Sequence, residues 1–249
     1  MKINILFYDS VSSTNTEALN QAKLGADEGL CIVAHHQTAG RGRRGRTWVS
    51  DKDAGLYFSI VLKPQLAMHD LPLITLMAGV AVADTLREFG VETDIKWVND
   101  ILANERKIAG ILAETTESPT GIAVIVGIGV NIRSSSLPPE IAAIATSIEA
   151  EDPSGEIPGV NELAIHLTKY LSRHYKTLSS PNGAAAIISE WQQRSTYFSG
   201  KLVSVVTESS TITGVTDGLE PNGALRVTTD DGQTEVIQAG DVQNLRADH

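Results

Sequence analysis

The segment Gln37–Trp48 reads QTAGRGRRGRTW, and it decides which kind of fold the sequence can adopt. Gly40–Gly45 match the pattern G-x-G-x-x-G. In a dinucleotide-binding fold this pattern needs a preceding strand, a following helix and an acidic residue about 20 positions further on. A strand-like segment, 29–36, does precede the glycines, but 47–53 carry no helical apolar stripe and 61–66 (VLKPQL) hold no Asp or Glu. The sequence therefore predicts an arginine-rich loop between two strands and argues against a dinucleotide-binding fold.

The composition of this loop indicates an anionic ligand. Glycine lets the backbone approach a ligand closely, and the arginine side chain carries a fork of donors that matches carboxylate and phosphate oxygens. The arginines are Arg41, Arg43, Arg44 and Arg46. Because they repel one another, we expect the empty loop to be mobile and to become ordered around an anion. The alternative is a solvated surface loop that binds nothing.

The net charge separates a small anionic ligand from a nucleic acid. The chain carries 20 Lys and Arg against 30 Asp and Glu, a net charge of −10. Without the four loop arginines the rest of the chain has a net charge of −14. A general nucleic-acid binder spreads positive charge over a whole face, since its affinity comes from neutralising many phosphates. Positive charge confined to one loop of an acidic chain favours a small anionic ligand.

Composition also suggests a cytoplasmic protein. The 249 residues can hold one large core and a small second domain. No apolar run approaches the about 18–20 residues of a membrane helix, and the first ten residues do not have the pattern of a signal peptide. The single cysteine, Cys31, lies in an apolar segment and is expected to be buried, which agrees with a reducing compartment. We therefore expect no membrane partner.

Periodicity and turn signals divide the chain into two parts. Strands are predicted at 2–8, 29–36, 55–63 (alternating apolar and polar), 94–98, 109–115 and 122–132, and helices at 13–24, 73–89, 160–176 and 183–195. Residues 134–158 are rich in Ser, Pro and Glu and predict a surface excursion. The last fifty residues contain short Val/Thr-rich strands. Their expected hairpin turns are Asp217-Gly218, Asn222-Gly223 and Asp231-Gly232.

Four motifs in the first part carry a resemblance to a known family. They are Ser13-Thr14-Asn15, the arginine loop from Gln37 to Trp48, the pair Lys96-Trp97-Val98-Asn99-Asp100 and Lys107–Glu114, and Val126–Asn131. In this order and spacing, with a compatible C-terminal barrel, the chain resembles the biotin protein ligases. The resemblance covers 13–131. The related lipoate-attaching enzymes have the same fold without this arginine loop.

The resemblance implies an α+β fold in two domains. A mixed-sheet catalytic domain of the biotin/lipoate ligase type, 1–198, is followed by a small SH3-like β-barrel, 199–249. It also implies an ATP-dependent, AMP-forming enzyme. Biotin attacks ATP to give biotinyl-5′-AMP and pyrophosphate, and a lysine of a biotin carboxyl carrier protein domain then takes the biotinyl group. Mg²⁺ and a homodimer are further expectations from the family.

The family also implies roles for individual residues. The expected biotin-binding residues are Ser13, Thr14, Asn15, Gln37, Gly40, Arg41, Arg43, Lys107, Gly110 and Gly127. The expected ATP- and adenylate-binding residues are Arg41, Arg43, Arg44, Arg46, Trp48, Asn99, Lys107 and Asn131. The expected catalytic residues are Lys107, Arg43 and Asp100. In this scheme Lys107 bridges the carboxylate and the α-phosphate, Asp100 receives the incoming lysine, and the metal ligands are left open.

Simpler interpretations remain for several of these residues. Ser13 and Thr14 are also plausible helix caps, Lys107 could be an exposed turn lysine, and Asn131 could serve only the turn after a strand. Val98 replaces the proline that the family usually has, which leaves the local loop geometry in doubt.

The sequence leaves two alternative functions, and it predicts that a DNA-binding domain found in part of the family is absent here. A ligase or transferase for lipoate or octanoate would use the same fold, and an RNA-binding module would use the arginine loop alone. Some family members also repress transcription through an N-terminal DNA-binding domain. Only twelve residues precede Ser13 here, so we expect no such domain and no DNA partner.

Overall fold

The computed structural model describes residues 1–152, 155–208 and 210–244. Within these residues a seven-stranded mixed sheet forms the larger part, in the order β1-β2-β3-β7-β6-β5-β4. Its strands are β1 (Asn4–Tyr8), β2 (Leu30–Ala34), β3 (Gly55–Leu62), β4 (Asp94–Lys96), β5 (Asp100–Ala103), β6 (Arg106–Ser118) and β7 (Gly121–Asn131). β1 and β2 pair in parallel, and the other neighbours are antiparallel.

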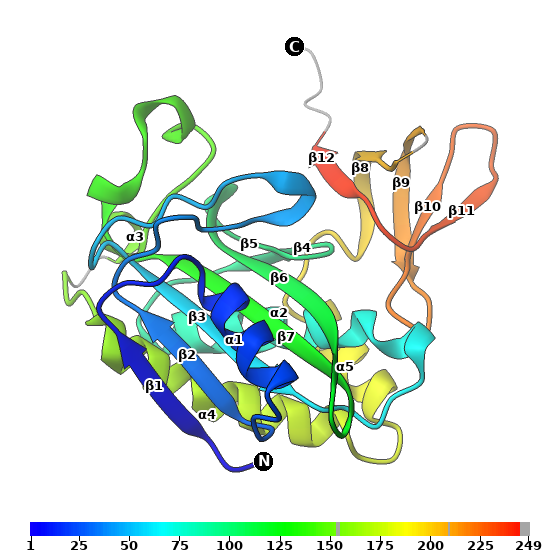
Figure 1. Ribbon diagram of the computed structural model, residues 1–249. Coiled ribbons are helices and arrows are strands. Elements are labelled where there is room, and N and C mark those ends of the chain that lie inside the picture. The colour runs from blue at the N-terminus through cyan, green and yellow to red at the C-terminus, as the bar shows by residue number, and fades with distance from the viewer. Residues whose placement is uncertain (153–154, 209, 245–249) are drawn as a thin grey trace.

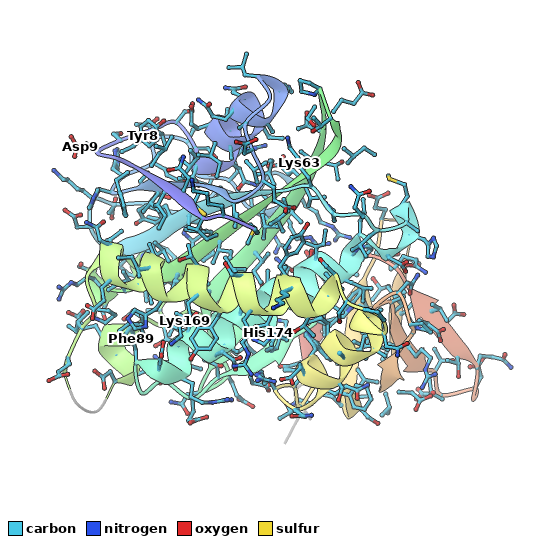
Figure 2. All side chains as sticks on the ribbon, turned by 90° about the horizontal axis from the view of Figure 1, so that it is seen from below. Tyr8, Asp9, Lys63, Phe89, Lys169 and His174 are labelled. Atoms are coloured by element: carbon cyan, nitrogen blue, oxygen red, sulfur yellow. The ribbon has the colours of Figure 1, made fainter. Side chains whose placement is uncertain are left out.

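Helices cover both faces of this sheet. The α-helices of the described residues are α1 (Thr14–Lys23), α2 (Pro72–Glu88), α3 (Ile148–Glu151), α4 (Val160–Leu178) and α5 (Gly183–Gln192). α1 lies on one face, while α2 and α4 lie on the other, with α5 packed against both of them (Figure 1). Figure 2 shows α4 running across its face of the sheet, with Lys169 and His174 on it. The result is a domain of three layers, and its α+β class with a mixed sheet is the one that the sequence predicts.

β3 differs from its predicted half-buried pattern. The sequence suggested alternating exposure, but all eight residues of β3 are buried. Phe58 and Ile60 pack into the large core under α2 and α4, whereas Val61 joins a smaller core under α1. Both faces are covered because β3 is central in the sheet. Ser59 is therefore a fully buried polar residue.

α2 has sequence signals for a helix at both of its ends, and it lies in the core. Pro72 occupies the first turn, where a missing N–H costs nothing, and Gly90 follows the end with φ +75°. The segment Met68–Glu88 is long and apolar enough to cross a membrane by length and composition, but 72% of its most apolar window is buried inside the protein. That burial is typical of a core helix.

The strands around residue 100 were only partly predicted. β5 was not expected, and β6 extends well beyond the predicted 109–115. β5 has only four residues, so its periodicity is too short to detect. β5 pairs with both β4 and β6, and this ladder brings Asp100 opposite Gly110.

The C-terminal part is an all-β domain, drawn in orange and red in Figure 1. In the described residues its antiparallel sheet has the order β11-β10-β9-β8-β12. The strands are β8 (Ser199–Val206), β9 (Thr211–Leu219), β10 (Leu225–Thr228), β11 (Thr234–Ile237) and β12 (Asp241–Asn244). Residues 245–249 of the predicted 199–249 domain lie outside the described residues.

One predicted hairpin turn is wrong. Asn222-Gly223 and Asp231-Gly232 lie between paired strands, but Asp217-Gly218 lies inside β9. Gly218 has φ +93°, and its N–H donates to the carbonyl of Phe198. The glycine therefore serves a local irregularity of the strand, where positive φ is tolerated.

Candidate functional site

Two adjoining pockets lie where the arginine loop faces β5, β6 and β7. The inner pocket, about 480 Å³ of open space, is lined by Ser13, Thr14, Asn15, Gln37, Arg41, Gly42, Arg43, Trp48, Tyr57, Phe58, Asn99, Lys107, Gly110, Ile111, Leu112, Gly127, Ile128 and Gly129. The outer pocket, about 1160 Å³ of space that includes open solvent, is lined by Gly42, Arg43, Arg46, Thr47, Trp48, Val49, Lys96, Trp97, Asn99, Asp100, Lys107, Asn131, Leu137, Ile141, Ala145, Asp241, Val242 and Gln243. Gly42, Arg43, Trp48, Asn99 and Lys107 border both. One ligand with two parts can therefore span the pair.

The start of α1 forms one wall of the inner pocket. Ser13 is the N-cap but makes no side-chain capping hydrogen bond. Instead Gln37 reaches across: its Oε1 accepts from the Thr14 backbone N–H at 2.8 Å and from the Thr14 hydroxyl at 3.2 Å. The Gln37 amide in turn donates to Ser50 at 2.8 Å. The predicted pair Ser13 and Thr14 thus meets Gln37, 23 positions after Thr14, at the N-terminal end of α1.

Asn15 is directed away from solvent into the sheet. Its Nδ2 donates to the Leu112 carbonyl at 3.2 Å and to Glu114 at 2.8 Å, and its Oδ1 accepts from Ser59 at 2.6 Å. A Cβ on Gly127 would lie 2.1 Å from this Oδ1. Gly127, a predicted biotin-binding residue, therefore makes room for the Asn15 side chain, and it also lines the inner pocket.

Trp48 lies between the two pockets. A Cβ on Gly129 would lie 2.5 Å from the Trp48 ring, and one on Gly110 would lie 3.1 Å from it. Gly110 and Gly129 pair directly across β6 and β7, so the ring rests on a flat glycine platform. The Lys107 ammonium lies 5.5 Å from the ring centre. Among the described residues the Trp48 N–H has no hydrogen-bond partner, and it is buried against Gly129.

The four loop arginines do not act as one group. Arg41 binds Glu114 of the sheet through two hydrogen bonds, of 3.0 and 2.7 Å. Arg43 donates to Asn99 at 3.0 Å and to the Gly240 carbonyl at 3.1 Å. Burial lowers the pKa of the Arg43 guanidinium, although Asp241 acts in the opposite direction.

The outer three arginines surround one carboxylate of the C-terminal domain. Asp241 lies 3.4 Å from Arg43, 3.6 Å from Arg44 and 2.7 Å from Arg46. Three cations around a single carboxylate leave excess positive charge, which favours a further anion. Two predicted site residues, Arg44 and Gly40, lie outside both pockets. Arg44 donates instead to the Val206 carbonyl. A Cβ on Gly40 would lie 2.4 Å from the Trp48 carbonyl.

Lys107 and Asp100 form a close ion pair at the border of the pockets. The Lys107 Nζ lies 2.6 Å from one oxygen of Asp100, and Lys96 lies 3.9 Å from the other. Burial lowers the pKa of the Lys96 ammonium, although Asp100 acts in the opposite direction. Lys96 was not singled out from the sequence, although it stands in the same motif as Asp100.

The excursion after β7 supports the backbone of Lys107. The Lys107 N–H donates to the Ile144 carbonyl at 2.8 Å, and the Thr146 N–H donates to the Lys107 carbonyl at 2.9 Å. Asn131 donates to the Thr146 carbonyl at 2.9 Å. The same excursion lines the outer pocket with Leu137, Ile141 and Ala145. A segment without periodic pattern gave no sequence signal for this role.

The described residues contain no group of three or more His, Cys, Asp or Glu that could hold a metal by themselves. Asp100 and Asp241 are the carboxylates of the outer pocket. Mg²⁺ commonly uses only one or two protein carboxylates together with phosphate oxygens and water. The site therefore fits Mg²⁺ brought with a polyphosphate and does not fit a stand-alone metal centre.

Two segments of the chain match known protein families. Residues 7–131 match the biotin/lipoate A/B protein ligase family, and 198–243 match the biotin protein ligase C-terminal domain.

Similar proteins cover nearly the whole chain. A bifunctional ligase/repressor of Bacillus spizizenii is 33% identical over 240 residues, covering 95% of this chain and 73% of that protein. A biotin–[acetyl-CoA-carboxylase] ligase of Mycobacterium tuberculosis is 32% identical, covering 94% and 86%. The biotin protein ligase of Aquifex aeolicus, solved with biotin and ATP, has a TM-score of 0.84 and 28% identity, with 98% and 99% covered.

Proposed function

This chain belongs to the biotin/lipoate A/B protein ligase family, and we propose that it is an ATP-dependent biotin–protein ligase. It activates biotin to biotinyl-5′-AMP and transfers the biotinyl group to a lysine of a biotin carboxyl carrier protein domain. The observation that carries the proposal is the pair of pockets that meet at Arg43, Trp48, Asn99 and Lys107. The biotin ligases among the similar proteins support the choice of substrate.

The two pockets suit the two substrates of the first step. The inner pocket has apolar walls and a few polar groups, which suits a small ring system with a ureido group. The outer pocket carries the arginines and suits a nucleotide. A carboxylate oxygen of biotin attacks the α-phosphorus of ATP, and the bond to pyrophosphate breaks. Lys107 stands where both anions meet and offsets their repulsion.

The second step needs a neutral amine. The carrier lysine attacks the acyl carbon of biotinyl-5′-AMP, AMP leaves, and the attacking nitrogen loses a proton. Asp100 borders the outer pocket. It accepts the proton of the attacking nitrogen, or it orients the ammonium of the carrier lysine before that proton leaves. Mg²⁺ belongs to the proposal as a counter-charge for the phosphates, with no protein ligand assigned to it.

The cellular setting is also part of the proposal. The buried single Cys31 suits a reducing cytoplasm, and a homodimer is the expected assembly. Sedimentation of the purified protein with and without biotin and ATP tests the dimer, since a monomer under all conditions contradicts it.

One transfer experiment tests the activity. The protein is incubated with biotin, ATP, Mg²⁺ and a carrier domain, and the carrier is weighed by mass spectrometry. The expected result is one added biotinyl group that requires ATP. Lipoate and octanoate replace biotin in parallel reactions, and their preferential transfer would point to the alternative acid. If no acid is transferred and mixed RNA shifts in a salt-dependent gel assay, the RNA-binding alternative holds.

A further inference from the structure

We propose that Glu114 is a positioning residue for the inner pocket, which it does not itself line. It holds Arg41 on one side and Asn15 on the other, and the affinity for biotin depends on it. The inference rests on the proposed function and adds a determinant of biotin binding behind the pocket wall.

Glu114 connects the arginine loop to α1 through one carboxylate. Its two oxygens accept from the Arg41 guanidinium at 3.0 and 2.7 Å, and one of them also accepts from the Asn15 amide at 2.8 Å. An isolated ion pair on the protein surface contributes little to the free energy of folding. Here the Glu114 side chain is 26% exposed, the contact with Arg41 is bidentate, and a third donor joins it, which makes the arrangement geometrically specific.

The negative charge of Glu114 also fixes how the Asn15 amide is turned. The hydroxyl of Ser59, which is fully buried, has one proton but lies within hydrogen-bond distance of both Asn15 Oδ1 (2.6 Å) and Thr14 Oγ1 (2.8 Å). It cannot donate to both at once. A carboxylate can only accept, so Glu114 keeps the Asn15 Nδ2 toward itself and Oδ1 toward Ser59. With the Ser59 proton directed to Asn15, the Thr14 hydroxyl on the pocket wall has the Ser59 oxygen at 2.8 Å and Gln37 Oε1 at 3.2 Å as acceptors for its own single proton.

The contact also separates the loop into two parts. Arg41 is bound to the sheet through Glu114, whereas Arg43, Arg44 and Arg46 are bound to Asp241 of the C-terminal domain. Movement of the outer part with nucleotide need not disturb Arg41. The family implies contact of Arg41 with nucleotide as well, but Arg41 lines only the inner pocket, so we expect Glu114 to affect biotin affinity more than the Michaelis constant for ATP.

The test variant is Glu114→Gln, which keeps the shape and removes the charge. The amide N–H2 of the new glutamine would face the donors of Arg41 or Asn15, which it cannot pair with. Biotin should therefore bind about tenfold more weakly. This factor is at the low end of what the loss of a hydrogen bond to a charged group produces. The Michaelis constant for ATP should change less. Biotin dissociation constants come from titration calorimetry, and Michaelis constants for ATP from adenylate formation at saturating biotin.

The matched control is Glu117→Gln, an exposed glutamate three residues further along β6. It should bind biotin like the wild type. Wild-type affinity in Glu114→Gln would overturn the inference, and so would equal losses for biotin and ATP, which a general structural defect produces. A wild-type protein that does not bind biotin would instead overturn the proposed function.

A double-mutant cycle separates the loss of this contact from a general structural effect of Glu114→Gln. Arg41→Gln removes the same ion pair from the other side. Glu114→Gln should then weaken biotin binding less in the Arg41→Gln background than in the wild type, because the shared contact is already lost. Additive effects of the two changes would contradict coupling between Glu114 and Arg41.

Discussion

At the scale of single residues, Lys107 is held through both its side chain and its backbone. Its ammonium contacts Asp100 and faces the Trp48 ring. Its backbone is bonded on both sides to the excursion that contains Ile144 and Thr146. A lysine held in this way presents a fixed positive charge at the border of the two pockets, which is where charge develops when a carboxylate meets a phosphate.

Lys107→Ala should abolish adenylate formation while biotin still binds. The inner pocket keeps Thr14, Gln37 and its apolar walls, whereas the charge that brings the two anions together is gone. Pyrophosphate release measures the first reaction, and calorimetry measures biotin binding. Lys176→Ala, at an exposed position near the end of α4, is the control for loss of one lysine. Adenylate formation at the wild-type rate would rule out Lys107 as the charge bridge.

The residues that the sequence missed share one property. Arg41 meets Glu114 across 73 positions, and Arg46 meets Asp241 across 195. No local pattern shows such a contact, so the sequence identified these two arginines but assigned no role to Glu114 or Asp241, the carboxylates that hold them. Ser59 was missed for another reason. A serine among the apolar residues of a strand indicates a side chain that faces solvent, whereas β3 is buried on both faces.

At the scale of elements, the arginine loop is a small hairpin with its own hydrogen bonds. The Gly42 N–H donates to the Arg46 carbonyl at 2.7 Å, and the Trp48 N–H donates to the Gly40 carbonyl at 3.0 Å. At its tip Arg44 has φ +54° and Gly45 φ +72°. The sequence predicted a loop from the glycines and arginines. It could not predict the hairpin, whose tip is supported by β8 and β12.

Residues 37–50 should be cut by trypsin in the free protein and protected with biotin and ATP bound. Repulsion among Arg43, Arg44 and Arg46 opposes a fixed loop, and Asp241 neutralises only part of it. A polyphosphate supplies the missing counter-charge and stabilises the ordered state by mass action. Cleavage after Arg43 or Arg44 is followed by mass spectrometry. Equal cleavage rates with and without ligands would contradict the expected ordering.

At the scale of the whole molecule, a buried ion cluster joins the helices behind the sheet. Asp84 of α2 accepts from His174 of α4 and from Arg194 beyond α5, both at 2.8 Å. Figure 2 shows His174 on the side of α4 near α5. Burial alone would raise the pKa of Asp84, but the hydrogen bonds from His174 and Arg194 outweigh it and lower the pKa below the usual value.

The stability of the protein should therefore fall in acid in a way that depends on Asp84. A carboxyl group whose pKa is lower in the folded state stabilises that state above its unfolded pKa of about 3.8. That contribution is lost as the pH falls through the folded pKa. Asp84→Asn should lower the free energy of unfolding at neutral pH by on the order of 3 kcal/mol, and the difference should shrink below about pH 4.

Urea unfolding of both proteins from neutral pH to pH 3 measures this difference. Asp230→Asn, the same chemical change at an exposed turn position, should cost little at any pH. A cost of Asp84→Asn that stays constant down to acid pH would show that the charge of Asp84 is not what stabilises the helix packing.

The two domains meet at the site itself, and this contact should control how long the intermediate stays bound. Arg43 is half-buried and donates to Asn99 of the catalytic domain and to Gly240 and Asp241 of the C-terminal domain. An acyl-adenylate reacts with water and with free amines, so it must be held until the carrier lysine arrives. Arg43 is the loop arginine that contacts both domains and borders both pockets.

Arg43→Gly should still form biotinyl-5′-AMP, because Lys107 and the other arginines remain, but should release it faster. Loss of a hydrogen bond to a charged group corresponds to about a 10- to 150-fold increase in dissociation. The released adenylate then labels any nearby amine. Wild type and Arg43→Gly are each incubated with biotin, ATP and an unrelated lysine-rich protein, and the biotinylated lysines are counted by mass spectrometry. If Arg43→Gly forms adenylate yet labels that protein no more than wild type does, Arg43 does not retain the intermediate.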